Sequence, residues 1–153
     1  MAAENSKRRV LRVGICLVLV LILCVIWGHS LMNGEESSNV SSAVGKFLRQ
    51  LFPFLDTQSA AGTHILRKCG HFLEFFALGI CLSSLFLLLG KKPVWAQIWG
   101  MAVACIDESI QLFIPGRSGR FADVILDSCG LAVGICLVCL IHWLKNGKKG
   151  NQP

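Results

Sequence analysis

Three titratable side chains at helical spacing open the second apolar run of the chain. Arg67, His71 and Glu74 are four and three residues apart, so they share one face if the run is a helix. The residues that follow, Phe75 to Leu89, contain no charge and are apolar enough to cross a bilayer. Titratable groups within a membrane span are costly, and they indicate a functional site by default. The alternative is that Arg67 and Lys68 only mark the water interface and that Glu74 is a paired structural carboxylate.

Two later stretches carry more polar residues beside apolar runs. The third run contains Asp107 and Glu108 in its second half, and the fourth begins around Asp123 and Asp127. If each of four runs crosses the membrane, these groups and those of the second run lie in one layer on the non-cytoplasmic side. That segregation predicts a polar pocket open to the outer face. The predicted members of the pocket are Arg67, His71, Glu74, Asp107, Glu108, Gln111, Arg117, Asp123 and Asp127.

Several of these charges need partners, because a charge at the centre of a membrane helix costs about 2.5–3.5 kcal/mol on insertion scales. The pairs expected from the sequence are Arg67 or Arg117 with Glu108 or Asp123, and His71 with Glu74 or Asp127. A network of this kind is purely structural if it leaves no space between its members.

Three kinds of chemistry fit such a pocket. His71 and Glu74, with a carboxylate from the third or fourth run, have the donor types of a divalent-metal site. One histidine among scattered carboxylates is a weak signal, so we predict no metal and no other cofactor. His71 with a carboxylate could instead act as a general acid–base pair while Arg67 and Arg117 hold a phosphate or carboxylate. The third reading is binding without turnover, and no residue is assigned as catalytic.

Composition predicts the elements that must position these groups. The chain has 153 residues, of which 54% are hydrophobic, and its mean hydropathy is +0.61, well above the usual value for a soluble domain. We predict a single domain over 1–153 that is an all-α membrane protein, a four-transmembrane-helix bundle. The predicted spans are about 10–30, 65–90, 93–114 and 122–143.

The distribution of charge predicts orientation rather than a polyanionic partner. The net charge is +6, and the basic residues gather at the ends of runs that four spans would place on one side. They are Lys7, Arg8, Arg9, Arg12, Lys91, Lys92, Lys145, Lys148 and Lys149. Excess Lys and Arg in short loops marks the cytoplasm, so we expect both termini inside and no nucleic-acid partner. The first run is expected to stay as an uncleaved signal anchor, since its apolar core is long for a signal peptide.

The predicted outer loop, 31–64, has two parts. Residues 32–44 are rich in Ser, Asn, Gly and Glu and are expected to form a solvated linker. Residues 44–55 carry apolar side chains at helical spacing, which predicts one extracellular amphipathic helix that stops near Pro53. This helix either lies on the outer leaflet or caps the bundle. In the fourth run, Gly130 and Gly134 form a G-x-x-x-G motif, which predicts close helix packing.

Three motifs together resemble a known family. They are Arg67-Lys68-x-x-His71-Phe72-x-Glu74-Phe75, Asp107-Glu108-x-x-Gln111-x-Phe113-x-Pro115-Gly116-Arg117, and Asp123-x-x-x-Asp127-x-x-Gly130. Their order and spacing resemble those of the VanZ-like membrane proteins, and they cover about half of the chain. The resemblance implies a bacterial plasma-membrane protein, multi-pass, of a family whose founding member is associated with resistance to teicoplanin-type glycopeptides. Phe75 stands where many members carry tyrosine, and Asp127 where asparagine is common.

Three hypotheses for function follow. In the first, the pocket binds an envelope lipid or a lipoglycopeptide-like ligand and lowers susceptibility to such antibiotics without turnover. In the second, the chain is an intramembrane enzyme acting on a lipid-linked or phosphorylated envelope precursor, with His71 as acid–base. In the third, the charges hold the bundle together and the chain is a structural membrane partner with no ligand. The lipid bilayer is the one partner common to all three, and the sequence does not fix the oligomeric state.

Overall fold

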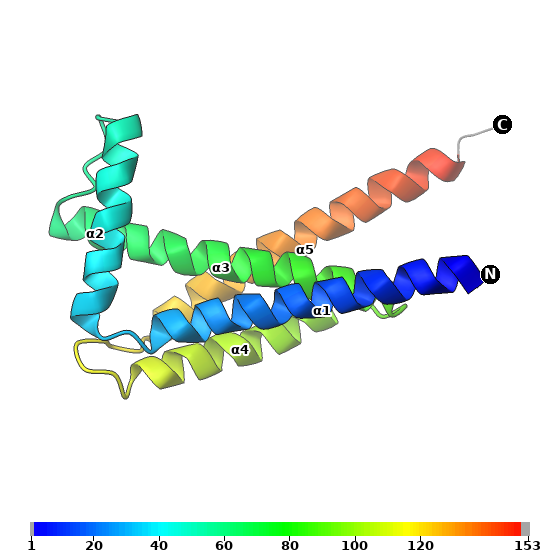
Figure 1. The fold of residues 1–153 in the computed structure, drawn as a ribbon, viewed down its shortest axis with the longest axis horizontal. Helices are drawn as coiled ribbons and strands as arrows, with labels where there is room; N and C mark the ends of the chain where they lie inside the picture. Colours follow the sequence, from blue (N-terminus) through cyan, green and yellow to red (C-terminus); the bar gives the residue numbers. More distant parts are fainter. Residues whose placement is uncertain (1, 151–153) are drawn as a thin grey trace.

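The protein is an all-α bundle crossed at one end by a further helix. The computed structural model describes residues 2–150, and side chains from residue 4 to 147, so Lys148 and Lys149 lie outside the described side chains. Within this part of the chain there are five helices: α1 (Ala2–Ser30), α2 (Gly34–Leu51), α3 (Ala60–Leu88), α4 (Trp95–Gln111) and α5 (Phe121–Gly150). Figure 1 shows both termini at one end of the bundle and α2 across the other end.

Three of these helices are long and apolar enough to cross a membrane. They are α1 from Glu4 to Ser30, α3 from Ala60 to Leu88, and α5 from Phe121 to Gly147. The chain is therefore a multi-pass membrane protein. Helix α4 has 17 residues, about 26 Å at 1.5 Å per residue, which is slightly shorter than a hydrocarbon core of about 30 Å. The fourth span and the orientation of the bundle remain predictions.

The buried apolar core is small, as expected where lipid covers most of the surface. Ile26 of α1, Phe75 of α3, Ala104 of α4 and Leu131 of α5 are fully buried, so each long helix and α4 contribute to one core. Many large apolar side chains on the same helices are exposed, which suits contact with lipid chains. The eight cysteines are free.

Helices α3 and α5 approach each other through glycine, as the G-x-x-x-G motif predicted. A Cβ atom added at Gly130 would collide with the backbone carbonyl of Phe72, and one at Gly134 with that of Phe76. On the facing helix, a Cβ at Gly79 would collide with the carbonyl of Leu131. We call these three glycines the glycine seam. It brings two backbones into direct contact, which only residues without a side chain permit.

The predicted linker over 32–44 is wrong, because helix α2 begins at Gly34. Asn33 caps it: the Asn33 Oδ1 accepts from the Glu36 backbone N–H at 2.9 Å, and the Glu36 Oε2 accepts from the Asn33 N–H at 3.0 Å. This capping box satisfies donors that would otherwise be orphaned at the helix start. The helix ends at Leu51, before Pro53, and α3 begins at Ala60, so most of the predicted 31–64 loop is helical.

The small polar residues of α2 form a packing face. Ser37, Ser41 and Gly45, spaced four apart, are buried. Gly45 lies so close to the segment before α3 that an added Cβ would be 2.8 Å from the Thr57 carbonyl oxygen, and the Thr57 hydroxyl donates to the Gly45 carbonyl at 2.7 Å. The serine and glycine content that resembled a linker therefore allows α2 to pack closely across the end of the bundle.

Candidate functional site: a polar cavity at the α2 end of the bundle

A polar cavity of about 250 Å³ lies between α3, α4, α5 and the loop that joins α4 to α5. Seven of the nine predicted pocket residues line it, namely Arg67, His71, Glu108, Gln111, Arg117, Asp123 and Asp127. The lining also includes His64, Lys68, Gly116, Ser118, Arg120 and Leu126, which were outside the predicted set. Space therefore remains between these charged groups, unlike in a network whose charges fill the interior completely.

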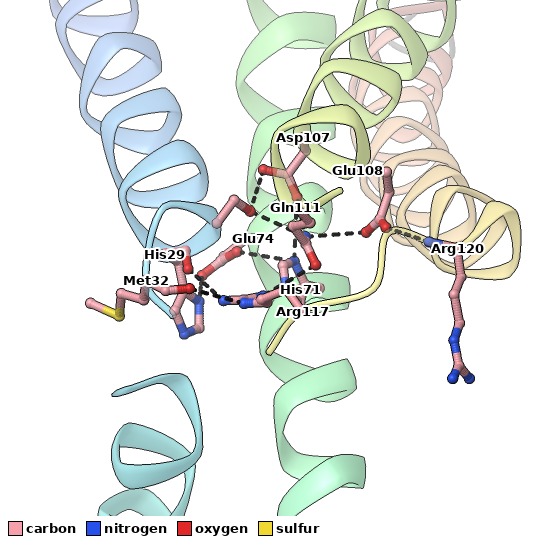
Figure 2. Close-up of polar contacts among 10 residues, drawn as sticks. His29, Met32, His71, Glu74, Asp107, Glu108, Gln111, Arg117 and Arg120 are labelled. Atoms are coloured by element: carbon pink, nitrogen blue, oxygen red, sulfur yellow. Dashed lines mark hydrogen bonds and ion pairs between the residues drawn. The ribbon is translucent and has the colours of Figure 1, made fainter. Parts of the chain in front are cut away.

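The other two predicted residues, Glu74 and Asp107, lie behind the cavity wall and bond to the end of α1. The Glu74 Oε1 is 3.1 Å from the Nδ1 of His29. Asp107 is fully buried, and its Oδ1 accepts from the Ser30 hydroxyl at 2.6 Å. The imidazole rings of His29 and His71 are stacked, with centroids 5.6 Å apart. Figure 2 shows His29 of α1 beside Glu74 and His71 of α3.

His29 and Ser30 were missed as members of the polar layer. Their sequence position, at the end of an apolar run, resembles an interface or a poor cleavage site. The order of the apolar runs could have predicted both residues. If the four runs cross the membrane in alternating directions, the end of the first run lies at the same depth as the other polar groups.

Gln111 connects the polar groups of α4 through its amide. Its Nε2 lies within hydrogen-bond distance of three oxygens: Asp107 Oδ2 at 3.0 Å, Glu108 Oε1 at 3.2 Å and Ser30 Oγ at 3.2 Å. Glu108 is held from its other side, since its Oε2 accepts from the Arg120 backbone N–H at 2.9 Å. In Figure 2 the Arg120 guanidinium points away from this network, so Arg120 contributes its backbone rather than its charge.

Arg117 connects the loop after α4 to the end of α1 through hydrogen bonds. The prediction that it pairs with a carboxylate is wrong for the described residues. The Arg117 guanidinium donates to the carbonyl of His29 at 2.5 Å, to that of Met32 at 3.2 Å, and to Gln111 Oε1 at 3.2 Å. Carbonyls at a helix C-terminus lack partners within the helix and attract cations. Burial, and then the charge of Arg67, lowers the pKa of Arg117 from its usual high value. The two guanidinium groups are therefore close enough to affect each other.

The turn before Arg117, which positions its side chain, requires glycine at residue 116. Gly116 has φ of 74°, in the left-handed region that favours glycine. The preceding Pro115 accepts a hydrogen bond from the Gly34 N–H at 3.0 Å, and a Cβ at Gly34 would collide with the Gly116 carbonyl. The start of α2 and the Pro115-Gly116-Arg117 turn thus fit each other closely.

Lys68 is the cation that pairs with Asp123. The Lys68 Nζ is 2.6 Å from the Asp123 Oδ1, and both side chains are partly buried. The reading of Lys68 as a simple interface marker is therefore wrong, and so is the expected partner of Asp123. A long lysine side chain reaches a site off its own helix face because its charge sits at the end of a flexible stem.

Three cavity residues, Arg67, His71 and Asp127, have buried polar atoms without hydrogen-bond partners among the described residues. The Arg67 Nε is buried and makes no hydrogen bond, and neither carboxylate oxygen of Asp127 has a partner. Asp127 is fully buried. Such atoms in a polar cavity indicate where a ligand, an ion or water would bind.

His71 lies between carboxylates, close enough for electrostatic attraction but too far for a hydrogen bond. Its Nδ1 is 3.8 Å from Glu74 Oε2 and 3.8 Å from Asp107 Oδ2. The pairing of His71 with Glu74 is thus at ion-pair distance. Ligand atoms of His71, Asp107 and Asp127 all lie within 4.8 Å of one another, which is a different set from the His71–Glu74 group considered for a metal.

One comparison with known proteins gives a result. A family model described as VanZ/LLP1 matches residues 15–142 of the chain, a stretch that includes all of the cavity lining. No curated protein and no solved structure gives a significant match.

Proposed function

This chain belongs to the VanZ/LLP1 family, and on that basis we propose that it is a bacterial cell-membrane protein whose cavity binds the anionic group of a cell-envelope ligand. Such binding would lower susceptibility to teicoplanin-type glycopeptides without turnover. In this proposal the four helices α1, α3, α4 and α5 all cross the membrane. The basic residues near both termini face the cytoplasm by the positive-inside rule, so the cavity, at the other end of the bundle, opens outward.

The observation that carries the proposal is the guanidinium of Arg67, which is available to a ligand. The side chain of Arg67 lines the cavity, and its buried Nε has no hydrogen-bond partner among the described residues. The neighbouring cations already have partners, since Lys68 pairs with Asp123 and Arg117 donates to one carbonyl of α1 and to one just after it. Because a guanidinium matches the geometry of phosphate and carboxylate oxygens, Arg67 is the group best placed to receive an anion.

The size of the cavity limits what enters it. At about 250 Å³ it is smaller than most pockets for drug-sized molecules, which measure about 300–1,000 Å³. We therefore propose that a charged head group enters, while the rest of the ligand stays in the bilayer or outside it. Helix α2, which lies across this end of the bundle (Figure 1), would then border the entrance.

The test is antibiotic susceptibility in a susceptible Gram-positive host. The wild-type chain is expected to raise the inhibitory concentration of teicoplanin, and Arg67→Ala to remove that increase. Arg49→Ala is the matched control, because Arg49 is an exposed arginine on α2 outside the cavity lining. Immunoblots of membranes check that all three chains are present at equal amounts. An unchanged inhibitory concentration with intact wild-type protein contradicts the proposal.

A second function is favoured by the position of His71. Its buried imidazole lines the cavity and lies 3.8 Å from two carboxylates, an arrangement that suits general acid–base chemistry. The corresponding activity is hydrolysis or transfer on a lipid-linked or phosphorylated envelope precursor. Mass spectrometry of envelope lipids from cells with wild-type and His71→Ala chains tests it. Identical lipids in the two strains and in cells without the protein count against an enzyme.

A further inference from the structure

Three ligand-type side chains from three helices meet at the inner wall of the cavity. They are His71 of α3, Asp107 of α4 and Asp127 of α5, and one donor atom from each lies within 4.8 Å of the other two. All three residues are buried. The set combines one imidazole nitrogen and two carboxylate oxygens, which are common donors for divalent first-row metals.

Asp127 gives an independent indication that something binds here. It is fully buried, and neither of its oxygens has a hydrogen-bond partner among the described residues. An ionised carboxylate taken out of water without a partner is strongly disfavoured, and buried charges are generally paired or coordinate metals. The Nδ1 of His71 is also buried without a hydrogen bond, so two of the three members of the set have a buried polar atom with no hydrogen-bond partner among the described residues.

None of the lysines and arginines that line the cavity pairs with Asp107 or Asp127 within the described part of the chain, and two of these cations have other partners. Lys68 bonds to Asp123 at 2.6 Å, and the Arg117 guanidinium donates to the carbonyls of His29 and Met32 and to Gln111. Asp107 and Asp127 therefore have no ion-pair partner of Lys or Arg within the described part of the chain. Two carboxylates that no Lys or Arg of the described residues neutralises match the charge of one divalent cation.

We infer that His71, Asp107 and Asp127 bind a divalent transition-metal ion, of the Zn²⁺ or Mn²⁺ class, at the inner wall of the cavity. Ligands placed tetrahedrally about 2.1 Å from one ion lie about 3.4 Å apart, so donors that are now within 4.8 Å of one another need to approach by up to about 1.4 Å when the ion binds. His71 and Asp127 also line the cavity, whereas Asp107 lies behind them. Coordination positions not filled by protein therefore face the cavity.

Groups around the ligands hold the site in shape. Asp107 accepts from Ser30 at 2.6 Å and from Gln111 at 3.0 Å, which is the kind of support that orients a metal-binding carboxylate. The glycine seam fixes the positions of His71 and Asp127. Gly130 packs against Phe72, the residue that follows His71, and Gly130 itself lies one helical turn after Asp127.

Metal content of the purified full-length chain in detergent tests the inference without any antibiotic or substrate. After chelator treatment, the protein is equilibrated with Zn²⁺ or Mn²⁺, freed of unbound ion and measured by plasma mass spectrometry. We expect about one ion per chain, and loss of that ion in Asp127→Asn. Asp123→Asn is the matched control, since Asp123 lines the same cavity but is outside the three-residue set; it is expected to keep the ion.

A further variant keeps the inference testable if Asp127→Asn does not fold. Ser30→Ala retains all three ligands and removes a hydrogen bond to Asp107, so the Kd for the ion is expected to rise about 10- to 100-fold. Absence of bound ion in the folded wild-type chain, or equal loss in Asp123→Asn and Asp127→Asn, overturns the inference. A chain that binds the ion but leaves teicoplanin susceptibility unchanged contradicts only the proposed function.

Discussion

The same two helices, α3 and α5, make very different contacts along their length. They run in the same direction (Figure 1). At the glycine seam their backbones touch, with Gly130 against Phe72 and Gly134 against Phe76. One turn toward the α2 end, the contacts become polar, with Lys68 paired to Asp123 and His71 close to Asp127.

This difference shows how an apolar contact can position charges. Phe72 directly follows His71, and Gly130 is three residues after Asp127, so the seam sets the distance between these two polar side chains. Close backbone contact is rigid because it has no side-chain rotamers to adjust. The polar stretch, in contrast, leaves a cavity, because its long charged side chains do not fill the space between the helices.

The largest expected effect is obtained by breaking the seam. Gly130→Leu places a side chain against the Phe72 carbonyl, and backbone cannot move aside as a side chain can. We expect destabilisation of at least the roughly 1–3 kcal/mol typical of overpacked cores, measured as a lower unfolding midpoint in detergent. Gly70→Leu is the control, since a Cβ there meets nothing within 4 Å. Equal losses for the two variants would mean that close helix contact is not what Gly130 provides.

An intermediate effect is expected in the polar stretch behind the cavity. Ser30→Ala removes the 2.6 Å hydrogen bond to the buried Asp107, and a hydrogen bond to a charged group contributes about 1.5–3 kcal/mol. Denaturant titration in mixed micelles, with chelator present, measures the free energy of unfolding. Ser109→Ala is the comparison, because that exposed hydroxyl bonds only to its own helix, at Cys105. A loss no larger than that of Ser109→Ala would show that the α1–α4 hydrogen bond contributes little.

The smallest effect is expected at a partly exposed ion pair of the cavity lining. Lys68 and Asp123 form a short ion pair, but the Lys68 side chain is 38% exposed. Solvent-accessible pairs contribute about 0–1 kcal/mol, so a double-mutant cycle with Lys68→Met and Asp123→Asn should give a coupling energy in that range. A coupling energy well above about 1 kcal/mol would mean that this pair is shielded from solvent, for example by the membrane.

The fold was largely predictable where hydrophobicity alone decides it. The apolar runs predicted the positions of α1, α3, α4 and α5, and the pattern of Gly130 and Gly134 predicted close helix packing, but not that α3 is the partner helix. The prediction of a linker over 32–44 is wrong because serine and glycine favour both linkers and close packing. Ser37, Ser41 and Gly45 are buried in α2, and only the facing segment around Thr57 reveals which role they have.

Most members of the candidate site were also predictable, but their partners were not. Their spacing predicted that Arg67, His71 and Glu74 share a helix face, and a topology of four spans predicted the polar groups of α4 and α5 in the same layer. The expected pairing of Arg117 with a carboxylate failed because the carbonyls at the end of α1 compete for its donors. Spacing along one helix contains no information about such neighbours.

The sequence by itself determined that this chain is a multi-pass membrane protein of the VanZ/LLP1 family with polar residues at corresponding depths of several helices. Both conclusions follow from local properties, namely the length of apolar runs and the order of short motifs. Only the tertiary structure decided that His29 and Ser30 join the polar layer, that Lys68 pairs with Asp123, and that His71 meets Asp107 and Asp127. The physical reason is that helix register and rotation are set by backbone contacts between helices, and those contacts select which buried charges become neighbours.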